Sequence, residues 1–270
     1  MNSLCRLYGV TRQGYYAWRS RPRCARASHD EVLKGAIEDL HQGFRRAYGA
    51  PRLHKTLRAK GFSCSVRRVN RLMKELGIKA STSGLYQWHP GISDHYSASG
   101  NHLAGADPAM GKNVQWAGGF TYVRTAKGWL FHAVVMDLYS RRIIGWSFSR
   151  DRNAEFTKSA LRMALSERMV TSGCLFHSDQ GTEYAALEYR ELVEAAGLKS
   201  SMSRKGRPRD NAAVESYFGS MKAELAHQMS FANQIEATAH IMSYIEFYNR
   251  ERLHSSLNFK TPVEYEKLCA

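Results

Sequence analysis

Residues 174–184 read CLFHSDQGTEY and residues 209–224 read RDNAAVESYFGSMKAE, and these two stretches decide the fold. The first contains an apolar run that predicts a buried strand ending at Asp179, and the second predicts an amphipathic helix that carries Glu215 in its first turns. Thirty-five residues separate the two carboxylates. A carboxylate at a strand end and a carboxylate on a helix can converge on one divalent metal ion, which metal-assisted attack on a phosphodiester requires. Such a site needs at least one more carboxylate on a neighbouring strand.

Glu215 lies between Val214 and Phe218, close to the apolar face of the predicted helix. A carboxylate in that position is costly unless it is paired or bound to a metal. Asn211 one turn earlier and Lys222 two turns later share its side of the helix, and Lys222 is suited to hold a phosphate. The alternative is an ordinary Glu–Lys pair on the surface.

The loop before this helix reads SRKGRPRDN, residues 203–211, and is strongly basic. A basic loop beside a metal site is suited to clamp a DNA backbone, so we expect DNA contacts from Arg204, Lys205 and Arg207. Asp210 or Asn211 is the expected N-cap of the helix that follows.

Two further residues have open roles. His177 precedes Asp179 by two residues and therefore points to the same face of the strand. It could orient a water molecule or contact a phosphate, and a buried, hydrogen-bonded histidine is equally consistent with the pattern. Asp137 is expected to pair with Arg141 or Arg142 across a turn.

The net charge of +15 is concentrated at one end of the chain. Residues 1–80 contain 18 Lys and Arg against 5 Asp and Glu, whereas residues 81–270 contain 21 against 19. A basic segment joined to a nearly neutral one indicates a nucleic-acid-binding module attached to a second, working domain. The alternative is a basic surface that serves solubility alone.

The segment SVRRVNRLMKELG, residues 65–77, predicts a helix with Ser65 as cap and Gly77 as stop. Its apolar stripe comprises Val66, Val69, Leu72, Met73 and Leu76. The basic residues off this stripe are expected to contact DNA, with a solvated basic face as the alternative; they are Arg67, Arg68, Arg71 and Lys74.

The chain is expected to form three regions. Residues 1–80 predict helices, and LCRLYGVTRQGYYAW within them resembles half of a helix-turn-helix opened by a Thr11 cap. Residues 81–112 have little periodicity and predict a linker. Residues 113–270 predict three consecutive strands followed by alternating helices and strands, which indicates an α/β fold with a mixed sheet flanked by helices.

Several protein classes are disfavoured. The five cysteines are scattered and include no CxxC pair, so a disulfide framework or zinc site is not expected. We expect no membrane association, because no apolar run reaches the length of a membrane span and the N-terminus lacks the apolar core of a signal peptide. The expected location is the cytoplasm.

Taken together, these strings resemble the transposases of IS-three-like insertion sequences, specifically the product of the second open reading frame. The resemblance covers nearly the whole chain. The N-terminal part is similar to the helix-turn-helix-like region of that family. WAGGFTYVRT, HSDQGTEY, the Glu215 helix and YIEFYNRERLHSSLNFKTPVEY resemble its retroviral-integrase-type core.

The resemblance implies an RNase H-like fold with an Asp-Asp-Glu triad that binds two Mg²⁺ ions, Mn²⁺ being an alternative. It implies cleavage at transposon ends, then attack of a 3′-hydroxyl on another phosphodiester. Asp179 and Glu215 match the second and third family carboxylates. The first falls in a W-x-x-D-x-T-Y pattern, where this chain has Gly119, so the resemblance also implies a catalytically disabled site.

The implied partners are double-stranded DNA, both transposon ends and target, and further copies of the chain in a dimer or larger assembly. A DNA-binding product of an upstream reading frame is a further partner in the family, and a bacterial, nucleoid-associated location is implied. Two alternatives remain: a non-catalytic DNA-binding regulator of transposition, which Gly119 favours, and an RNA-degrading RNase H, which the basic N-terminal helices disfavour.

Overall fold

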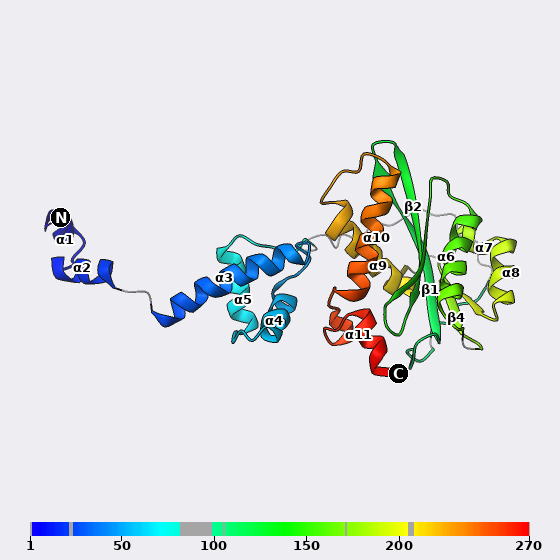
Figure 1. The fold of residues 1–270 in the computed structure, drawn as a ribbon, viewed down its shortest axis with the longest axis horizontal. Coiled ribbons are helices and arrows are strands. Elements are labelled where there is room, and N and C mark those ends of the chain that lie inside the picture. The colour runs from blue at the N-terminus through cyan, green and yellow to red at the C-terminus, as the bar shows by residue number, and fades with distance from the viewer. Residues whose placement is uncertain are drawn as a thin grey trace. The chain divides into compact units, whose positions relative to one another are not determined.

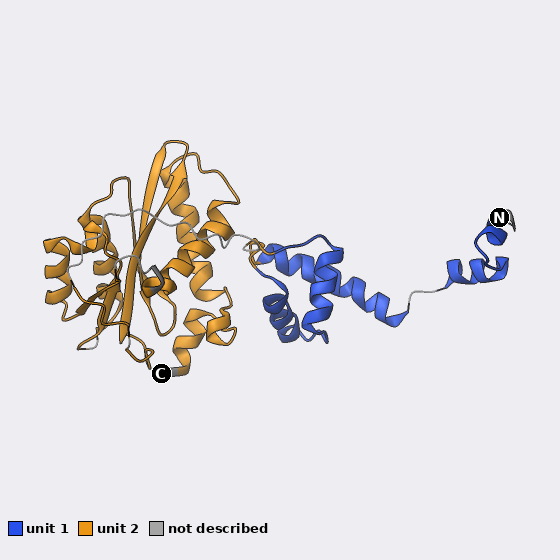
Figure 2. Cartoon of the chain, turned by 180° about the vertical axis from the view of Figure 1, so that it is seen from behind, with its two compact units in different colours: residues 1–43, 48–79 blue, residues 44–47, 80–270 orange. Residues whose placement is uncertain are grey.

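The computed structural model describes residues 2–21, 24–81, 99–104, 106–170, 172–204 and 208–269. The chain divides into two compact units, shown in different colours in Figure 2. We call residues 1–43 and 48–79 the helical unit, and residues 44–47 and 80–270 the sheet unit. Of the expected linker 81–112, residues 82–98 and 105 lie outside the described residues.

The helical unit contains only helices among its described residues, and Figure 1 labels them α1 (Asn2–Leu7), α2 (Arg12–Ser20), α3 (Ala25–Gly43), α4 (Ala50–Ala59) and α5 (Val66–Glu75). The Thr11 hydroxyl accepts a hydrogen bond from Gly14 N and caps α2, as the sequence predicts. Ser65 caps α5 in the same way through Arg68 N. The buried side chains Leu33, Leu53 and Leu72 come from α3, α4 and α5 and form part of the core of this unit.

The sheet unit is built on a mixed five-stranded sheet with strand order β3-β2-β1-β4-β5. Its strands are β1 (Gln115–Thr125), β2 (Gly128–Asp137), β3 (Ile143–Ser149), β4 (Leu175–Ser178) and β5 (Lys199–Met202). The first three form an antiparallel meander, and β4 and β5 run parallel to β1. The predicted α/β class and mixed sheet are therefore confirmed.

Helices cover both faces of this sheet (Figure 1). One face packs against α6 (Ala154–Glu167), α7 (Thr182–Ala185) and α8 (Leu187–Ala195), with Trp116, Phe156 and Phe176 in the shared core. The other face packs against α9 (Ala212–Met221) and α10 (Gln234–Arg250), which contact β1 and β2. The chain ends with α11 (Pro262–Glu266) and a short 3-10 turn.

Helices α7 and α8 are separate, because Ala186 between them has an extended backbone with ψ of 139°. One sequence expectation about local structure needs correction. Asp137 pairs with neither Arg141 nor Arg142. It is fully buried, and its carboxylate accepts hydrogen bonds from the backbone N–H groups of Asn113, Tyr139 and Ser140.

The partner of Arg142 is instead Glu266, at 2.7 Å. Adjacency in sequence suggested the wrong partner for Asp137, because backbone amides of the turn satisfy the carboxylate first. No helix among the described residues combines the length and apolar character needed to cross a bilayer.

Candidate active site and nucleic-acid interface

Asp179 follows directly after β4, and Gly119 lies in the middle of β1. The parallel pairing of these strands aligns Trp116 with Phe176 and Ala117 with His177. Continued by two residues, that register places position 119 beside position 179. Because side chains two residues apart point to the same face of a strand, both positions face the α9 side of the sheet.

The surroundings of Gly119 place it under the helix that carries Glu215. A Cβ atom built at Gly119 would lie 2.7 Å from Val214 Cγ1 and 3.5 Å from both Asn211 Nδ2 and Phe218 Cε2. Val214 and Phe218 lie on α9 one residue before and three residues after Glu215. Positions 119, 179 and 215 therefore come toward one another from β1, the end of β4 and α9. Two of them, Asp179 and Glu215, carry carboxylates.

Glu215 is exposed, although the buried residues Val214 and Phe218 flank it. Partial burial raises the pKa of its carboxyl group, and the nearby charge of Asp179 raises that pKa further. Asp179 is half-buried, and its Oδ1 accepts a hydrogen bond from Gly181 N at 3.0 Å. Two carboxylates that repel each other in this way attract a cation.

The donor set suits at most a small cation site. Mg²⁺ is usually held by one or two carboxylates together with water and substrate phosphates, and Asp179 and Glu215 can supply two. A third donor is missing: within the described ranges, no group of three His, Cys, Asp or Glu side chains is arranged to hold a metal ion. A pair of ions that share a carboxylate does not fit, because Gly119 has no side chain to bridge them.

Buried hydrogen bonds set the position of α9 over the sheet. Asn211 is at the N-cap position, but its side chain forms no capping bond; its Nδ2 donates to Gly118 O at 2.9 Å instead. Of the two residues expected at the cap, Asp210 and Asn211, Asn211 occupies the position, but its side chain does not cap the helix. Two residues beyond Glu215, the Tyr217 hydroxyl lies 3.2 Å from His132 Nε2 on β2.

Lys222 lies at the point where α9 passes into a π-helical turn, Lys222–Ala226. Its ammonium group lies 5.1 Å from the centre of the Tyr122 ring, and burial lowers its pKa. No ion pair joins Lys222 to Glu215 in the described part of the chain. A π-turn at this place is notable because such turns often occur at functional sites.

His177 has a structural role in this structure. It is fully buried, and its two ring nitrogens lie 2.9 Å from Ser201 Oγ and 3.0 Å from Ser203 Oγ. Burial lowers its pKa to about 4, so the ring is neutral near pH 7. Of the two roles left open by the sequence, the geometry favours the buried, hydrogen-bonded one.

The basic loop before α9 is described only in part. Lys205 and Arg207 lie outside the described residues. Arg204 is exposed and forms a bidentate ion pair with Asp210, at 3.0 Å from Nε and 2.9 Å from Nη2. Asp210 therefore holds this arginine at the start of the Glu215 helix, and the sequence did not predict that pair.

The four basic residues expected on α5 fall into two classes. Arg68 and Arg71 each lie 2.6 Å from a different oxygen of Asp30 on α3. Arg67 and Lys74 are exposed, and no hydrogen bond or ion pair engages them in the described structure. Asp30 was not singled out from the sequence. Its signal was available, since acidic residues are rare in the basic first third of the chain.

Three protein-family models match this chain, two in the sheet unit and one mainly in the helical unit. The family described as Integrase core domain matches residues 110–208, and a second family of that description matches residues 196–262. The family described as HTH-like domain matches residues 28–84.

Proteins of similar sequence cover almost the whole chain. It is 36% identical over 270 residues to the transposase InsF for insertion sequence IS3A from Escherichia coli K12, covering 98% of this chain and 93% of that protein. It is also 36% identical over 265 residues to an uncharacterized 31 kDa protein of insertion element IS600 from Shigella sonnei, covering 98% and 97%.

Among solved structures, the catalytic core domain of HTLV-2 integrase in complex with magnesium superposes with a TM-score of 0.43 and 17% sequence identity. The match covers 58% of this chain and 98% of that one.

Proposed function

The chain belongs to the IS3 family of insertion-sequence transposases, whose members carry an HTH-like domain and an integrase core, and we propose that it binds the ends of its own element but scarcely cleaves them. The observation that carries the second half of this proposal is Gly119, a residue without a side chain that lies on β1 against the helix carrying Glu215. A third carboxylate would be needed there.

Binding of double-stranded DNA is supported by charge. The excess of basic residues lies in residues 1–80, where Arg67 and Lys74 are exposed and available for contacts with DNA. Contacts to phosphate oxygens release counterions. The logarithm of the affinity should therefore fall with the logarithm of the salt concentration, with a slope of about 0.9 per contacted phosphate. The expected partners are transposon ends, target DNA and further copies of the chain, since two ends must be joined.

The loss of cleavage is supported by the chemistry of the donor set. Divalent magnesium, when bound, would polarise the scissile phosphate and lower the pKa of the attacking water or 3′-hydroxyl. Asp179 and Glu215 would hold it, and Lys222 would hold a phosphate oxygen. Losing support around a metal ligand typically lowers affinity or activity by about 10–100-fold, and losing a direct ligand costs more.

The decisive experiment restores the missing carboxylate. Gly119→Asp is assayed with Mg²⁺ on duplexes that carry the ends of the element, and we expect strand cleavage to rise by at least about 10–100-fold. Gly119→Asn is the matched control, because it adds the same volume without the charge and should not gain activity.

Packing requires a companion variant. Val214 Cγ1 lies 2.7 Å from the built Cβ, so an aspartate at 119 must displace it. Gly119→Asp with Val214→Ala makes that space and should cleave at least as well as Gly119→Asp alone. Cleavage by the unaltered chain at the rate of the aspartate variants, or no gain in either variant with a normal melting temperature, would refute the proposed defect.

A second candidate function is a non-catalytic regulator that occupies ends or enters mixed assemblies with an active transposase. Gly119 favours it over an active enzyme for this chain. Titrating the unaltered chain into a reaction run by its Gly119→Asp variant tests it. A regulator should inhibit cleavage by the variant when present in less than equimolar amount. A chain that has only lost activity should leave the cleavage rate per molecule of the variant unchanged.

A further inference from the structure

Helix α5 arranges its residues in three parallel stripes. Val69, Leu72 and Met73 form a buried stripe that packs within the helical unit. Residues 68, 71 and 75, spaced by three and four, form a second stripe on one edge of that face. This second stripe is fully engaged by α3.

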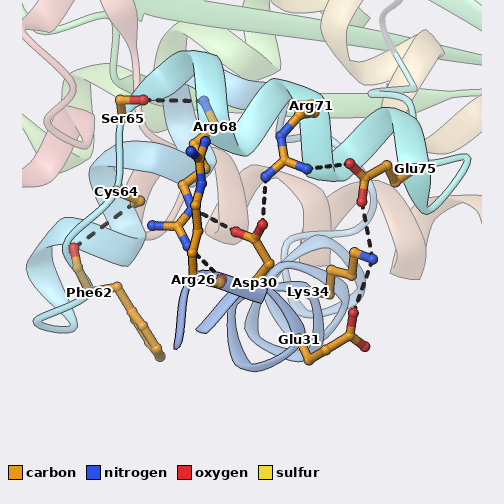
Figure 3. Close-up of polar contacts among 10 residues, drawn as sticks. All are labelled: Arg26, Asp30, Glu31, Lys34, Phe62, Cys64, Ser65, Arg68, Arg71 and Glu75. Atoms are coloured by element: carbon orange, nitrogen blue, oxygen red, sulfur yellow. Dashed lines mark hydrogen bonds and ion pairs between the residues drawn. The ribbon is translucent and has the colours of Figure 1, made fainter. Parts of the chain in front are cut away.

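Figure 3 shows how α3 holds the second stripe. Arg68 and Arg71 both donate to Asp30, and Glu75 accepts from Arg71 and lies 3.1 Å from Lys34. The hydrogen bond from Arg71, together with that from Arg68, holds the pKa of Asp30 below its usual value. We call residues 68, 71 and 75 the paired stripe, because each has its partner within the protein.

The third stripe has the same spacing and no partners. It comprises Arg67, Asn70 and Lys74, which are all exposed. Among the described residues, no hydrogen bond or ion pair engages their side chains. Asn70 is the only one that carries both a donor and an acceptor, and it lies between two cations. We call this the open stripe.

We propose that the open stripe reads base edges in the major groove of DNA, and that the paired stripe orients α5 without contacting DNA. The inference rests on the proposed DNA-binding function and assigns its sequence recognition. Asn70 recognises an adenine, because a carboxamide can donate to N7 and accept from N6–H₂ of that base. Arg67, nearer the helix start, recognises a guanine, and Lys74 contacts a phosphate.

The length of the open stripe matches this role. From residue 67 to residue 74 the helix rises about 10 Å, at 1.5 Å per residue. Base pairs stack about 3.4 Å apart, so the stripe spans about three of them. A helix of this size fits the major groove, and the first part of a recognition helix lies closest to the bases.

The paired stripe is a poor phosphate contact for an electrostatic reason. Arg68 and Arg71 already donate to Asp30, whose side chain is 13% exposed, so a phosphate that took those donors would have to displace the carboxylate. The displaced carboxylate would then lie unpaired near a phosphate of the same charge. Asp30 is therefore a positioning residue, and this reassigns two arginines that the sequence placed on the DNA.

The test uses the full chain and a pool of duplexes with a randomised 20-bp segment. Selected duplexes are sequenced for the unaltered chain, Asn70→Ala and Arg67→Ala. We expect Asn70→Ala to lose the preference for adenine at one position, and Arg67→Ala to lose it for guanine at another. Each loss should be about 5- to 150-fold in relative affinity, with the remaining motif unchanged.

Lys74→Ala is the matched variant on the same stripe. It should keep the motif and reduce the slope of log affinity against log salt by about 0.9, whereas Asn70→Ala should leave that slope unchanged. All three replaced side chains are exposed and unpaired, so unchanged thermal melting serves as the folding control.

Asp30→Asn tests the positioning role. It should lower discrimination at every position of the motif together, and Asp30→Glu should restore part of it because the charge returns. A purely structural role would change melting without changing the spread of selected sequences.

The outcomes separate this inference from the proposed function. No salt-dependent binding of any duplex by the unaltered chain would overturn the proposed function. Binding with a selected motif that Asn70→Ala and Arg67→Ala leave intact would overturn the inference alone. Binding without any motif would overturn the inference and also the preference for the element's own ends, but not the binding of DNA itself.

Discussion

The two units of this chain hold their charged side chains differently. In the helical unit, Asp30 meets Arg68 and Arg71 at the protein surface, with side chains that are 13%, 19% and 44% exposed. In the sheet unit, Glu224 meets Arg252 with side chains that are 0% and 5% exposed. The first network orients a helix in water, and the second is enclosed within the fold.

The contrast follows from what each unit has to bury. The ion pairs of the helical unit lie at its surface, where they are screened by salt and contribute little each. The sheet unit encloses its network between α9, α10 and the segment that follows. Glu224 there accepts from Arg252 at 2.6 Å and from the Tyr244 hydroxyl at 2.8 Å, so that no charge remains unpaired.

The largest effect should come from breaking the enclosed pair. Arg252→Met leaves the Glu224 carboxylate buried without its partner, and we expect it to lower the free energy of unfolding of the sheet unit by about 3–5 kcal/mol. Arg68→Met, the matched change in the helical unit, should have a much smaller effect, because water can solvate Asp30. Hydrogen exchange followed by mass spectrometry reports each unit separately.

The double variant Glu224→Leu with Arg252→Met is the control for that experiment, since it removes both charges and should recover much of the loss. Equal destabilisation by Arg252→Met and Arg68→Met would erase the contrast between the units.

An intermediate effect is expected from pH, and it sharpens the contrast because the two histidines whose pKa is lowered by burial, His132 and His177, belong to the sheet unit. Burial lowers the pKa of His132 and of His177 to about 4 each. Both are neutral when folded and take up protons below about pH 6.5 when unfolded, so stability falls as pH falls from about 6.5 toward 4.

Each histidine should add a slope of about 1.4 kcal/mol per pH unit within that window. Urea unfolding followed by tryptophan fluorescence measures this slope. His132→Gln should remove the contribution of one histidine, about 1.4 kcal/mol per pH unit, whatever its effect on stability at pH 7. A slope identical in the variant would contradict a neutral, buried His132.

The smallest effect concerns the two candidate site carboxylates. Asp179→Asn keeps the oxygen that accepts from Gly181 and removes the charge that helps to raise the pKa of Glu215. We expect millimolar Mg²⁺ to raise the melting temperature of the unaltered chain by a few degrees or less, and to raise that of the variant less. Equal stabilisation of both would place the cation elsewhere.

Much of this architecture could be predicted from local patterns. The apolar run ending at Asp179 and the helix carrying Glu215 are visible as periodicity, and so are the helix caps at Thr11 and Ser65. These features depend on residues close in sequence, whose spacing decides which face they share.

The partners of charged residues could not be predicted in the same way. Asp137 was expected to bind a neighbouring arginine and binds backbone amides instead. The ion pair of Arg68 with Asp30 was not indicated by the sequence either. In each case the partner depends on which group lies within reach of the carboxylate, and a pattern of residue types does not contain that distance.

The sequence by itself determined the fold class, the family and the glycine at position 119, because strand and helix periodicity and motif order are properties of the chain alone. Only the tertiary structure decided that Val214 fills the space above Gly119, that Asp30 engages two arginines of α5, and that Asn70 remains open between two cations. Those outcomes come from packing between segments far apart in sequence, where volume and distance determine which contacts form.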